Sequence, residues 1–393
     1  AERVLLRALT VATALLLALP WLVFPGLALW RLSRSTFLKD ERATAPDDAP
    51  FISIICPARN EARHIDGFVR AALASTYPRF ELIVVDDHST DGTGDLARVA
   101  GASDARFKVI DPPPLPAGWF GKQWACHVGA QHARGDVMLF TDADTRHGPE
   151  LLVRGINAMR RRQSDLLSVA GRQELGSFWE RVVQPAIFAT LFSTFGGTEA
   201  VSNSTRPKSK IGNGQCLLVR HDTYRALGGH EAVRAYAAED LMLAQQWCAA
   251  GKRVHLVGGL EYMSTRMYGS LGEIIEGWVK KTYAGGKYVM PGHPFFRWLM
   301  RFWMPLAPST GWIPFVALIL GLTGIAPVSW TTFGAAAYGV SVLYWLVIMR
   351  LMELPLAYAF LHPLGALVAS YIYLKAAWKG DNVTWKSRTY VAR

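Results

Sequence analysis

Three long apolar stretches with almost no charge constrain this chain more than any other feature. Between Val4 and Trp30 the only charged side chain is Arg7, and residues 304–349 and 354–374 contain none. Each stretch reaches the roughly 20 residues that a helix needs to cross a bilayer. An uncleaved signal sequence is the alternative for the first stretch, but its length and internal prolines favour an anchor. The sequence therefore predicts an integral membrane protein.

These stretches separate a polar domain from its membrane attachments. The polar region of roughly 270 residues is large enough to form its own hydrophobic core. A segment rich in aromatic and basic residues precedes the second stretch and is expected at the membrane interface. The predicted organisation is an N-terminal transmembrane anchor at 1–32, a cytosolic domain at 50–285, an interfacial amphipathic segment at 286–303, C-terminal transmembrane helices at 304–375 and a basic tail at 376–393.

The distribution of charge also favours a membrane protein. The net charge is +11, and basic residues such as Arg31, Lys375, Lys386 and Arg393 flank the apolar stretches. Flanking basic residues mark the cytoplasmic face and anionic lipid. We expect no nucleic-acid binding, because no nucleic-acid motif accompanies this charge. The number of complete crossings stays open, since prolines interrupt the C-terminal stretches. The cysteines form no C-x-x-C pair and are expected to be reduced and buried: Cys56, Cys126, Cys216 and Cys248.

The polar domain alternates short apolar strands with helical patterns. Strands are predicted at Phe51–Cys56, Glu81–Val85 and Asp136–Asp142, with helices at Glu61–Ala74 and Lys122–Ala133. This alternation implies an α/β fold with a largely parallel sheet that helices cover on both faces. Ligands of such sheets bind beyond the carboxyl ends of the strands.

Polar clusters stand where these strands end: "PARNEA" (57–62), "DDHSTDGT" (86–93) and "TDADT" (141–145). In an extended segment, period-two alternation would place Asp142 and Asp144 on the same side. Mg²⁺ or Mn²⁺ takes one or two such carboxylates plus substrate phosphates. The alternative for a single D-x-D is an ordinary turn or helix cap. Three clusters on one sheet edge favour a cleft for a nucleotide and a metal ion, and neither a P-loop nor a dinucleotide fingerprint is present.

Together with "AAEDLMLAQQW" (237–247), these clusters resemble the family 2 inverting glycosyltransferases with a GT-A catalytic domain. The resemblance covers most of residues 51–285 and implies a Rossmann-like domain that binds a nucleotide sugar, expected to be UDP-linked. The segments "EGWVKK" (276–281) and "VTWKSRTY" (383–390) are most similar to bacterial carotenoid- and hopanoid-associated members. This similarity places the chain in a bacterial cell membrane as a multi-pass protein with a cytoplasmic catalytic domain.

The resemblance also implies roles for individual residues. Asp142 and Asp144 would hold Mg²⁺ or Mn²⁺ on the donor diphosphate, where a cation offsets the charge of the leaving group. Asp240 would be the general base, with Glu239 orienting it or capping the helix. The alternative is that both acids only favour the positive N-terminus of a helix. Lys122 would contact the diphosphate or the ribose. The alternative is that it is an exposed lysine at the start of a helix. The expected nucleotide-sugar contacts are Pro57, Asn60, Glu61, Asp86, Asp87, Lys122 and Asp142.

The acceptor site is expected beside the glycine-rich segment "IGNGQC" (211–216) and a later helix. Trp278 matches the tryptophan of the Q-x-x-R-W motif of polymer-forming relatives, but Gly277 replaces the arginine, so polysaccharide synthesis is not expected. Apolar faces within 177–192 and 288–303 would frame the access of a lipid, with core packing as the alternative. The predicted acceptor contacts are Gly214, Gln215, Trp278 and Lys280. The histidines lack paired ligand spacing and are expected to be exposed or hydrogen-bonded: His147, His221 and His230.

The sequence thus predicts a membrane-bound inverting glycosyltransferase that moves one sugar from a nucleotide sugar to a lipid. The acceptor group would be a hydroxyl or carboxyl of a carotenoid, hopanoid, glycerolipid or sphingolipid. Two alternatives stay open. One is a non-catalytic membrane scaffold with a glycosyltransferase-like domain, and the other is a nucleotidyltransferase that releases pyrophosphate.

Overall fold

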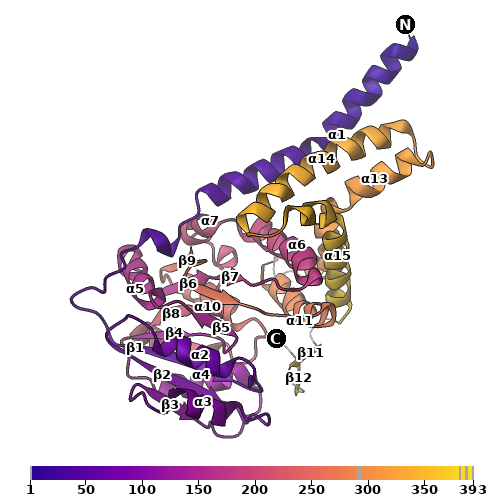
Figure 1. Cartoon of the computed structure of the whole chain (residues 1–393). Helices are drawn as coiled ribbons and strands as arrows, with labels where there is room; N and C mark the ends of the chain where they lie inside the picture. The colour runs from indigo at the N-terminus through magenta and orange to yellow at the C-terminus, as the bar shows by residue number, and fades with distance from the viewer. Residues whose placement is uncertain (1, 290–293, 380–381, 386–387, 392–393) are drawn as a thin grey trace. The chain divides into compact units, whose positions relative to one another are not determined.

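The computed structural model describes residues 2–289, 294–379, 382–385 and 388–391, and these form two compact units (Figure 1). Unit 1 comprises residues 1–33, 175–196 and 268–380, and unit 2 comprises residues 34–174, 197–267 and 381–393. Lys386 and Arg393 of the predicted basic tail lie outside the described residues. The rest of the tail includes a hairpin of β11 (Asn382–Trp385) and β12 (Arg388–Val391).

Unit 2 is built on a seven-stranded sheet with the strand order β3-β2-β1-β4-β8-β6-β9. All neighbouring strands are parallel except β8, which is antiparallel to both β4 and β6. The predicted α/β fold is therefore confirmed, with one reversed strand. The strands are β1 (Ile52–Ala58), β2 (Phe80–Asp86), β3 (Phe107–Ile110), β4 (Val137–Phe140), β6 (Leu166–Ala170), β8 (Leu217–Arg220) and β9 (Val254–Gly258).

Helices cover both faces of this sheet, which explains why its strands are apolar on both sides. Adjacent residues of β1 enter different cores: Ile54 packs in one cluster with Phe68, whereas Ile55 packs in another with Trp247. A smaller sheet joins β5 (Thr145–His147), β10 (Met263–Thr265) and β7 (Arg172–Gln173). The helices of unit 2 are α2 (Ile65–Leu73), α3 (Thr93–Gly101), α4 (Gly121–Gln131), α5 (Leu151–Arg162), α7 (Thr198–Asn203), α8 (His221–Ala226), α9 (Gly229–Ala232) and α10 (Glu239–Ala249).

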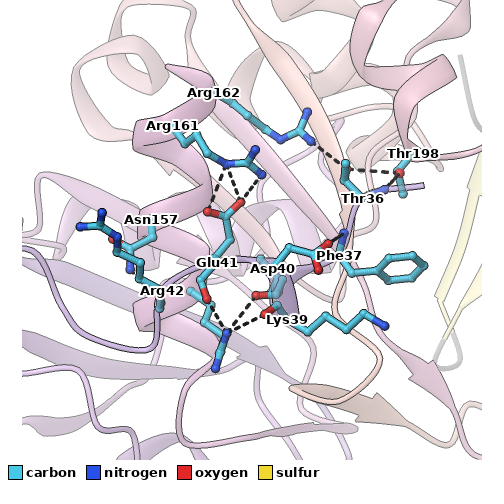
Figure 2. A network of polar contacts seen from close by, with 12 residues as sticks. Thr36, Phe37, Lys39, Asp40, Glu41, Arg42, Asn157, Arg161, Arg162 and Thr198 are labelled. Atoms are coloured by element: carbon cyan, nitrogen blue, oxygen red, sulfur yellow. Dashed lines mark hydrogen bonds and ion pairs between the residues drawn. The ribbon is translucent and has the colours of Figure 1, made fainter. Parts of the chain in front are cut away.

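A polar network fixes the start of unit 2 to helix α5 (Figure 2). Arg161 Nε donates to Glu41 Oε1 at 2.9 Å, and Arg162 Nη2 donates to Thr36 Oγ1 at 2.8 Å. The backbone N–H of Thr36 donates to Thr198 Oγ1 at 2.8 Å. We call residues 36–41 the strap. Because the strap is bonded in this way, unit 2 begins at Arg34, before the predicted boundary at residue 50.

The described residues of unit 1 form helices and the turns that join them, with no strand. Three of its helices, at 12–33, 328–351 and 356–379, are long and apolar enough to span a membrane, as the sequence predicts. The helices at 302–311 and 313–322 meet at 61°, so a fourth span would be bent or re-entrant. The α-helices are α1 (Glu2–Ser33), α6 (Phe178–Phe195), α11 (Leu271–Val289), α12 (Pro294–Leu306), α13 (Ile313–Leu322), α14 (Val328–Leu351) and α15 (His362–Lys379).

Helix α6 is largely a core element of unit 1. Val182, Val183 and Ile187 are buried and pack in one cluster with Trp278 of α11, whereas Phe178 at the start of α6 is 45% exposed. The expectation that this helix presents a broad apolar face to the membrane interface is therefore wrong for its centre. The sequence pattern failed here because a helix buried on all sides carries no polar face to orient it.

Candidate active site

The loops that follow β1 and β2 are bonded to each other at the carboxyl edge of the sheet. The N–H of Asn60 donates to Ser89 Oγ at 2.9 Å, and Asn60 Oδ1 accepts from the N–H of Thr90 at 2.9 Å. The N–H of Glu61 donates to Thr93 Oγ1 at 2.8 Å. Two of the predicted polar clusters therefore form one connected surface, as parallel strands require.

Asp86 and Asp87 belong to this surface and are almost fully buried. Asp86 Oδ1 accepts from the N–H of Ser89 at 3.3 Å, and Asp87 Oδ2 lies 3.6 Å from Arg59 Nη1. The sequence analysis missed Arg59, although it stands in the "PARNEA" segment. Its guanidinium faces the buried carboxylate of Asp87. The available signal was a basic residue within a segment that was already predicted to bind the nucleotide sugar.

The D-x-D pair follows β4 but is not extended. Ala143 and Asp144 form a turn, which the N–H of Thr145 closes on the carbonyl of Asp142 at 3.3 Å. Thr145 Oγ1 donates to the same carbonyl at 2.7 Å, and Thr141 Oγ1 donates to the carbonyl of Gln215 at 2.8 Å. The expectation of period-two alternation through this segment is therefore wrong, because threonine hydroxyls stabilise a turn at the strand end.

Lys122 joins the D-x-D pair to the E-D pair. Its Nζ lies 2.7 Å from Asp142 Oδ1 and 2.9 Å from Glu239 Oε1, and its side chain is 24% exposed. Burial disfavours the charged ammonium, but Asp142, Glu239 and Asp240 outweigh it and raise the pKa of Lys122. The alternative of an exposed lysine at a helix start is therefore wrong. Its ammonium forms an ion pair with one carboxylate of the D-x-D pair and with one carboxylate of the E-D pair.

Asp240 lies in the first turn of α10 with both carboxylate oxygens hydrogen-bonded. Oδ2 accepts from the N–H of Gly214 at 2.8 Å, and Oδ1 accepts from the N–H of Leu241 at 2.8 Å. Burial and the charge of Glu239 raise the pKa of Asp240. Burial opposes ionisation of Glu239 as well, but Lys122 outweighs it and the pKa of Glu239 is lowered. Adjacent carboxylates whose pKa values are pushed apart are typical of acid–base sites.

The glycine-rich loop before β8 lies against Asp240. A Cβ on Gly212 would stand 2.5 Å from the carbonyl oxygen of Asp240. A Cβ on Gly214 would stand 3.0 Å from Lys122 Nζ and 3.2 Å from Asp240 Oδ2. Gly212 cannot carry a side chain unless the backbone shifts, whereas a methyl group at Gly214 would require the Lys122 and Asp240 side chains to move by a few tenths of an ångström. Pro57, Lys122, Gly214 and Asp240 line one cavity at this place.

The donor set around Asp142 and Asp144 fits a divalent cation that is shared with a substrate. The described residues contain no cluster of three His, Cys, Asp or Glu side chains that would hold a metal alone. Two carboxylates separated by one residue supply the hard oxygen ligands that Mg²⁺ and Mn²⁺ accept, with phosphate oxygens and water completing the shell. One of these ligand oxygens, Oδ1 of Asp142, pairs with Lys122.

The predicted acceptor contacts fall into both units. Gln215 is buried in unit 2, where its Oε1 lies 3.4 Å from Gln173 Nε2, and its position follows Gly214. Trp278 and Lys280 lie on α11 in unit 1, and Trp278 is 6% exposed in the core against Phe188. The structure brings Gly214 and Gln215 to the site around Asp240. The roles of Trp278 and Lys280 stay predictions.

The three histidines considered in the sequence form hydrogen bonds within the protein. Buried Thr141 and Tyr224 hydroxyls bond His147 and His230 respectively, and burial lowers the pKa of His147 to about 4 and of His230 to about 3. The prediction of hydrogen-bonded histidines is confirmed for both, and His221 Nδ1 bonds the carbonyl of Gly135. All four cysteines are free thiols; three are buried as predicted, and Cys248 is partly exposed.

A Rossmann-like sheet whose carboxyl edge carries paired aspartates and a carboxylate at a helix start is typical of glycosyltransferases with the GT-A fold. The profile described as glycosyl transferase family 2 matches residues 53–228, so this part of the chain is similar to the family 2 glycosyltransferases.

Two curated relatives are similar to the chain over 265 and 243 residues. The 4,4′-diaponeurosporenoate glycosyltransferase of Staphylococcus haemolyticus is 27% identical over 265 residues, which cover 66% of this chain and 68% of that protein. The enzyme of the same name from Staphylococcus aureus strain USA300 is 29% identical over 243 residues, covering 60% and 62%. The chain thus spans slightly less than two thirds of the length of the second relative.

Among solved structures, a mannosyltransferase from Pyrobaculum calidifontis in complex with GDP-Man and Mn²⁺ is similar to the chain with a TM-score of 0.54. The similarity covers 94% of this chain and 98% of that one at 18% identity, so it bears on the fold. The GT-A fold that the sequence predicts is confirmed.

Proposed function

We propose that the chain transfers one sugar from a nucleotide sugar, expected to be UDP-linked, to a lipid acceptor in a membrane, with inversion at the anomeric carbon. The observation that carries this proposal is that Lys122 pairs with both Asp142 and Glu239, while Asp240, next to Glu239 on α10, accepts from Gly214 in the same cavity. Donor-side and acceptor-side groups of the predicted reaction therefore meet at one place on the sheet edge.

The chemistry follows from the position of each group. Asp240 accepts the proton of an acceptor hydroxyl. At the same time the hydroxyl oxygen forms a bond to the anomeric carbon of the sugar, and the bond between that carbon and the diphosphate breaks. Burial and the charge of Glu239 raise the pKa of Asp240, which makes its ionised carboxylate a stronger base. A divalent cation held by Asp142 and Asp144 would offset the charge of the departing diphosphate.

The connected loops after β1 and β2 are the proposed site of the nucleotide. Asp86 and Asp87 stand at the end of β2, and Asn60 and Arg59 face them from the end of β1. The bonds between the loops hold this surface in one shape before a ligand arrives, which reduces the entropy cost of binding.

The names of the relatives support a carotenoid acceptor, since both specify 4,4′-diaponeurosporenoate. Three helices of unit 1 with the length and apolar composition of membrane spans support an acceptor that resides in the bilayer. The intact carboxylates Asp142, Asp144 and Asp240 argue against a non-catalytic scaffold. The remaining alternative, a nucleotidyltransferase, would release pyrophosphate instead of a nucleoside diphosphate. The identity of the released product therefore distinguishes it from the proposed glycosyltransferase.

The test uses the full chain in detergent with lipid extract and a panel of UDP- and GDP-sugars. We expect release of a nucleoside diphosphate and formation of a glycolipid, detected by mass spectrometry. Asp240→Asn should lower transfer to a hydroxyl acceptor by about 10²–10⁴-fold, the usual contribution of a general base, with donor affinity nearly unchanged. Glu239→Gln should cost less. Release of pyrophosphate, or wild-type turnover in Asp240→Asn with a hydroxyl acceptor, would contradict the proposal.

The same variant distinguishes the two acceptor groups. An ionised carboxyl acceptor brings no proton to the reaction, so a base is not required for its attack. Asp240→Asn should therefore lose much less activity with a carboxyl acceptor than with a hydroxyl acceptor.

A further inference from the structure

Lys122 is placed on the oxygen that a divalent cation would need. Its Nζ lies 2.7 Å from Asp142 Oδ1, which is the distance of a direct ion pair. The same nitrogen lies 2.9 Å from Glu239 Oε1, so the ammonium has a second anchor on α10. A divalent cation and an ammonium repel each other, so each would weaken the binding of the other to this carboxylate.

The surroundings of Lys122 allow it to exchange partners. It extends from the second residue of α4 on a flexible side chain, and its head is a compact point charge with three donors. Gly214 lets the backbone pass close to the ammonium, since a Cβ there would lie 3.0 Å from Nζ. Glu239 would retain the ammonium near the site if the pair with Asp142 were broken. An ammonium at this place can contact a diphosphate that lies next to Asp142.

We propose that Lys122 is an exchangeable counter-ion, which neutralises Asp142 in the absence of donor and moves its ion pair to the donor diphosphate when the nucleotide binds. Asp142 is then released to the divalent cation. This inference rests on the proposed function, because it requires a nucleotide diphosphate as the ligand. Its consequence is that metal and nucleotide bind cooperatively, with equal effects of each on the affinity of the other.

The experiment measures binding without turnover. Mn²⁺ affinity is determined by electron paramagnetic resonance for the full chain in detergent, with and without UDP or GDP, and nucleotide affinity is determined by calorimetry with and without Mn²⁺. For the wild type we expect weak Mn²⁺ binding that nucleotide strengthens at least tenfold. Lys122→Met should bind Mn²⁺ at least tenfold more tightly than the wild type without nucleotide, and should bind nucleotide more weakly.

Two further variants make the result specific. Lys108→Met removes another lysine of an ion pair, whose Nζ lies 3.2 Å from Glu81 Oε2, and should leave Mn²⁺ affinity unchanged. Lys122→Met combined with Glu239→Gln removes both charges of the second pair, so that the buried Glu239 carboxylate is not left without its partner if the single variant fails to fold. The double variant should show the same gain in Mn²⁺ affinity.

The outcomes separate this inference from the proposed function. Unchanged or weaker Mn²⁺ binding in the Lys122 variants would overturn the counter-ion role, even if nucleotides bind. A gain in Mn²⁺ affinity without binding of either nucleotide to any variant would support the competition at Asp142 and overturn the role of a nucleotide. A merely structural role of Lys122 predicts weaker binding of both ligands, which is the opposite sign for the metal.

Discussion

Gly214→Ala tests how closely the glycine-rich loop approaches the catalytic carboxylate. The added methyl group would lie 3.0 Å from Lys122 Nζ and 3.2 Å from Asp240 Oδ2, where ordinary contacts begin at 3.4 Å. Lys122 ends in a flexible side chain, so it can retreat by a few tenths of an ångström without moving the backbone. The Asp240 carboxylate is held by two N–H groups, one of which belongs to Gly214 itself.

The expected effect is a loss of turnover rather than of fold. Weakening the hydrogen bond from Gly214 to the charged Asp240 removes about 1.5–3 kcal/mol from the orientation of that carboxylate. At about 1.4 kcal/mol for each factor of ten, turnover should fall roughly 10- to 100-fold. The free energy of unfolding should change by less than about 1 kcal/mol, since no backbone atom needs to move.

Alanine variants of two other glycines serve as controls for Gly214→Ala. Gly67 lies in α2, and a Cβ added there would have no neighbouring atom within 4 Å, so Gly67→Ala should keep wild-type turnover and gain at most about 1 kcal/mol of stability. Gly212→Ala would place a methyl 2.5 Å from the backbone carbonyl of Asp240, and this variant should lose stability as well as activity. Turnover is measured as nucleoside diphosphate release, and stability by thermal unfolding of the same preparations. Wild-type turnover in Gly214→Ala would refute the close approach.

Three further measurements follow from the structure. EDTA should abolish transfer, added Mg²⁺ or Mn²⁺ should restore it, and Asp144→Ala should be inactive but folded; full activity in chelator would exclude the metal. Burial raises the pKa of Glu81, but bonds from Ser53, Arg134 and Lys108 outweigh it and lower that pKa. The ionised Glu81 carboxylate therefore contributes its full stabilisation above the unfolded pKa of about 4.3, and this contribution declines as pH falls through the lower folded pKa. The unfolding curves of the wild type and Glu81→Gln should converge at low pH. Trp278→Ala should reduce transfer to lipid more than donor hydrolysis, and equal losses would mean that Trp278, which packs in the core of unit 1, has no part in acceptor access.

The α/β fold could be predicted because its strands carry an unusually clear pattern. Residues 51–56 and 81–85 are apolar and β-branched, and polar clusters follow each of them. Parallel strands bring such clusters to one edge, so topology alone predicted that Asp86 and Asp142 follow strands at the same edge of the sheet. The turn after β4 could not be predicted, because it depends on hydroxyl bonds from Thr145 that compete with extension.

The ion pairs of Lys122 were beyond the sequence pattern for a different reason. Its partners Asp142 and Glu239 are distant in the chain, and only the packing of α4, β4 and α10 brings them together. Local periodicity carries no information on which charges meet. The interruption of unit 2 by residues 175–196 escaped prediction similarly, because α6 has the composition of either a core helix or an interfacial one.

The strap limits how far the catalytic unit can move from its N-terminal helix. Only Arg34 and Ser35 separate the last residue of α1, Ser33, from bonded Thr36. A chain of three residue steps spans at most about 11 Å. If α1 anchors the protein in a bilayer as proposed, this short connection keeps Thr36 within about 11 Å of the end of α1 and so keeps the enzyme at the membrane surface. Acceptor encounter then becomes a search in two dimensions, and its rate depends on the surface density of the lipid rather than on its bulk concentration.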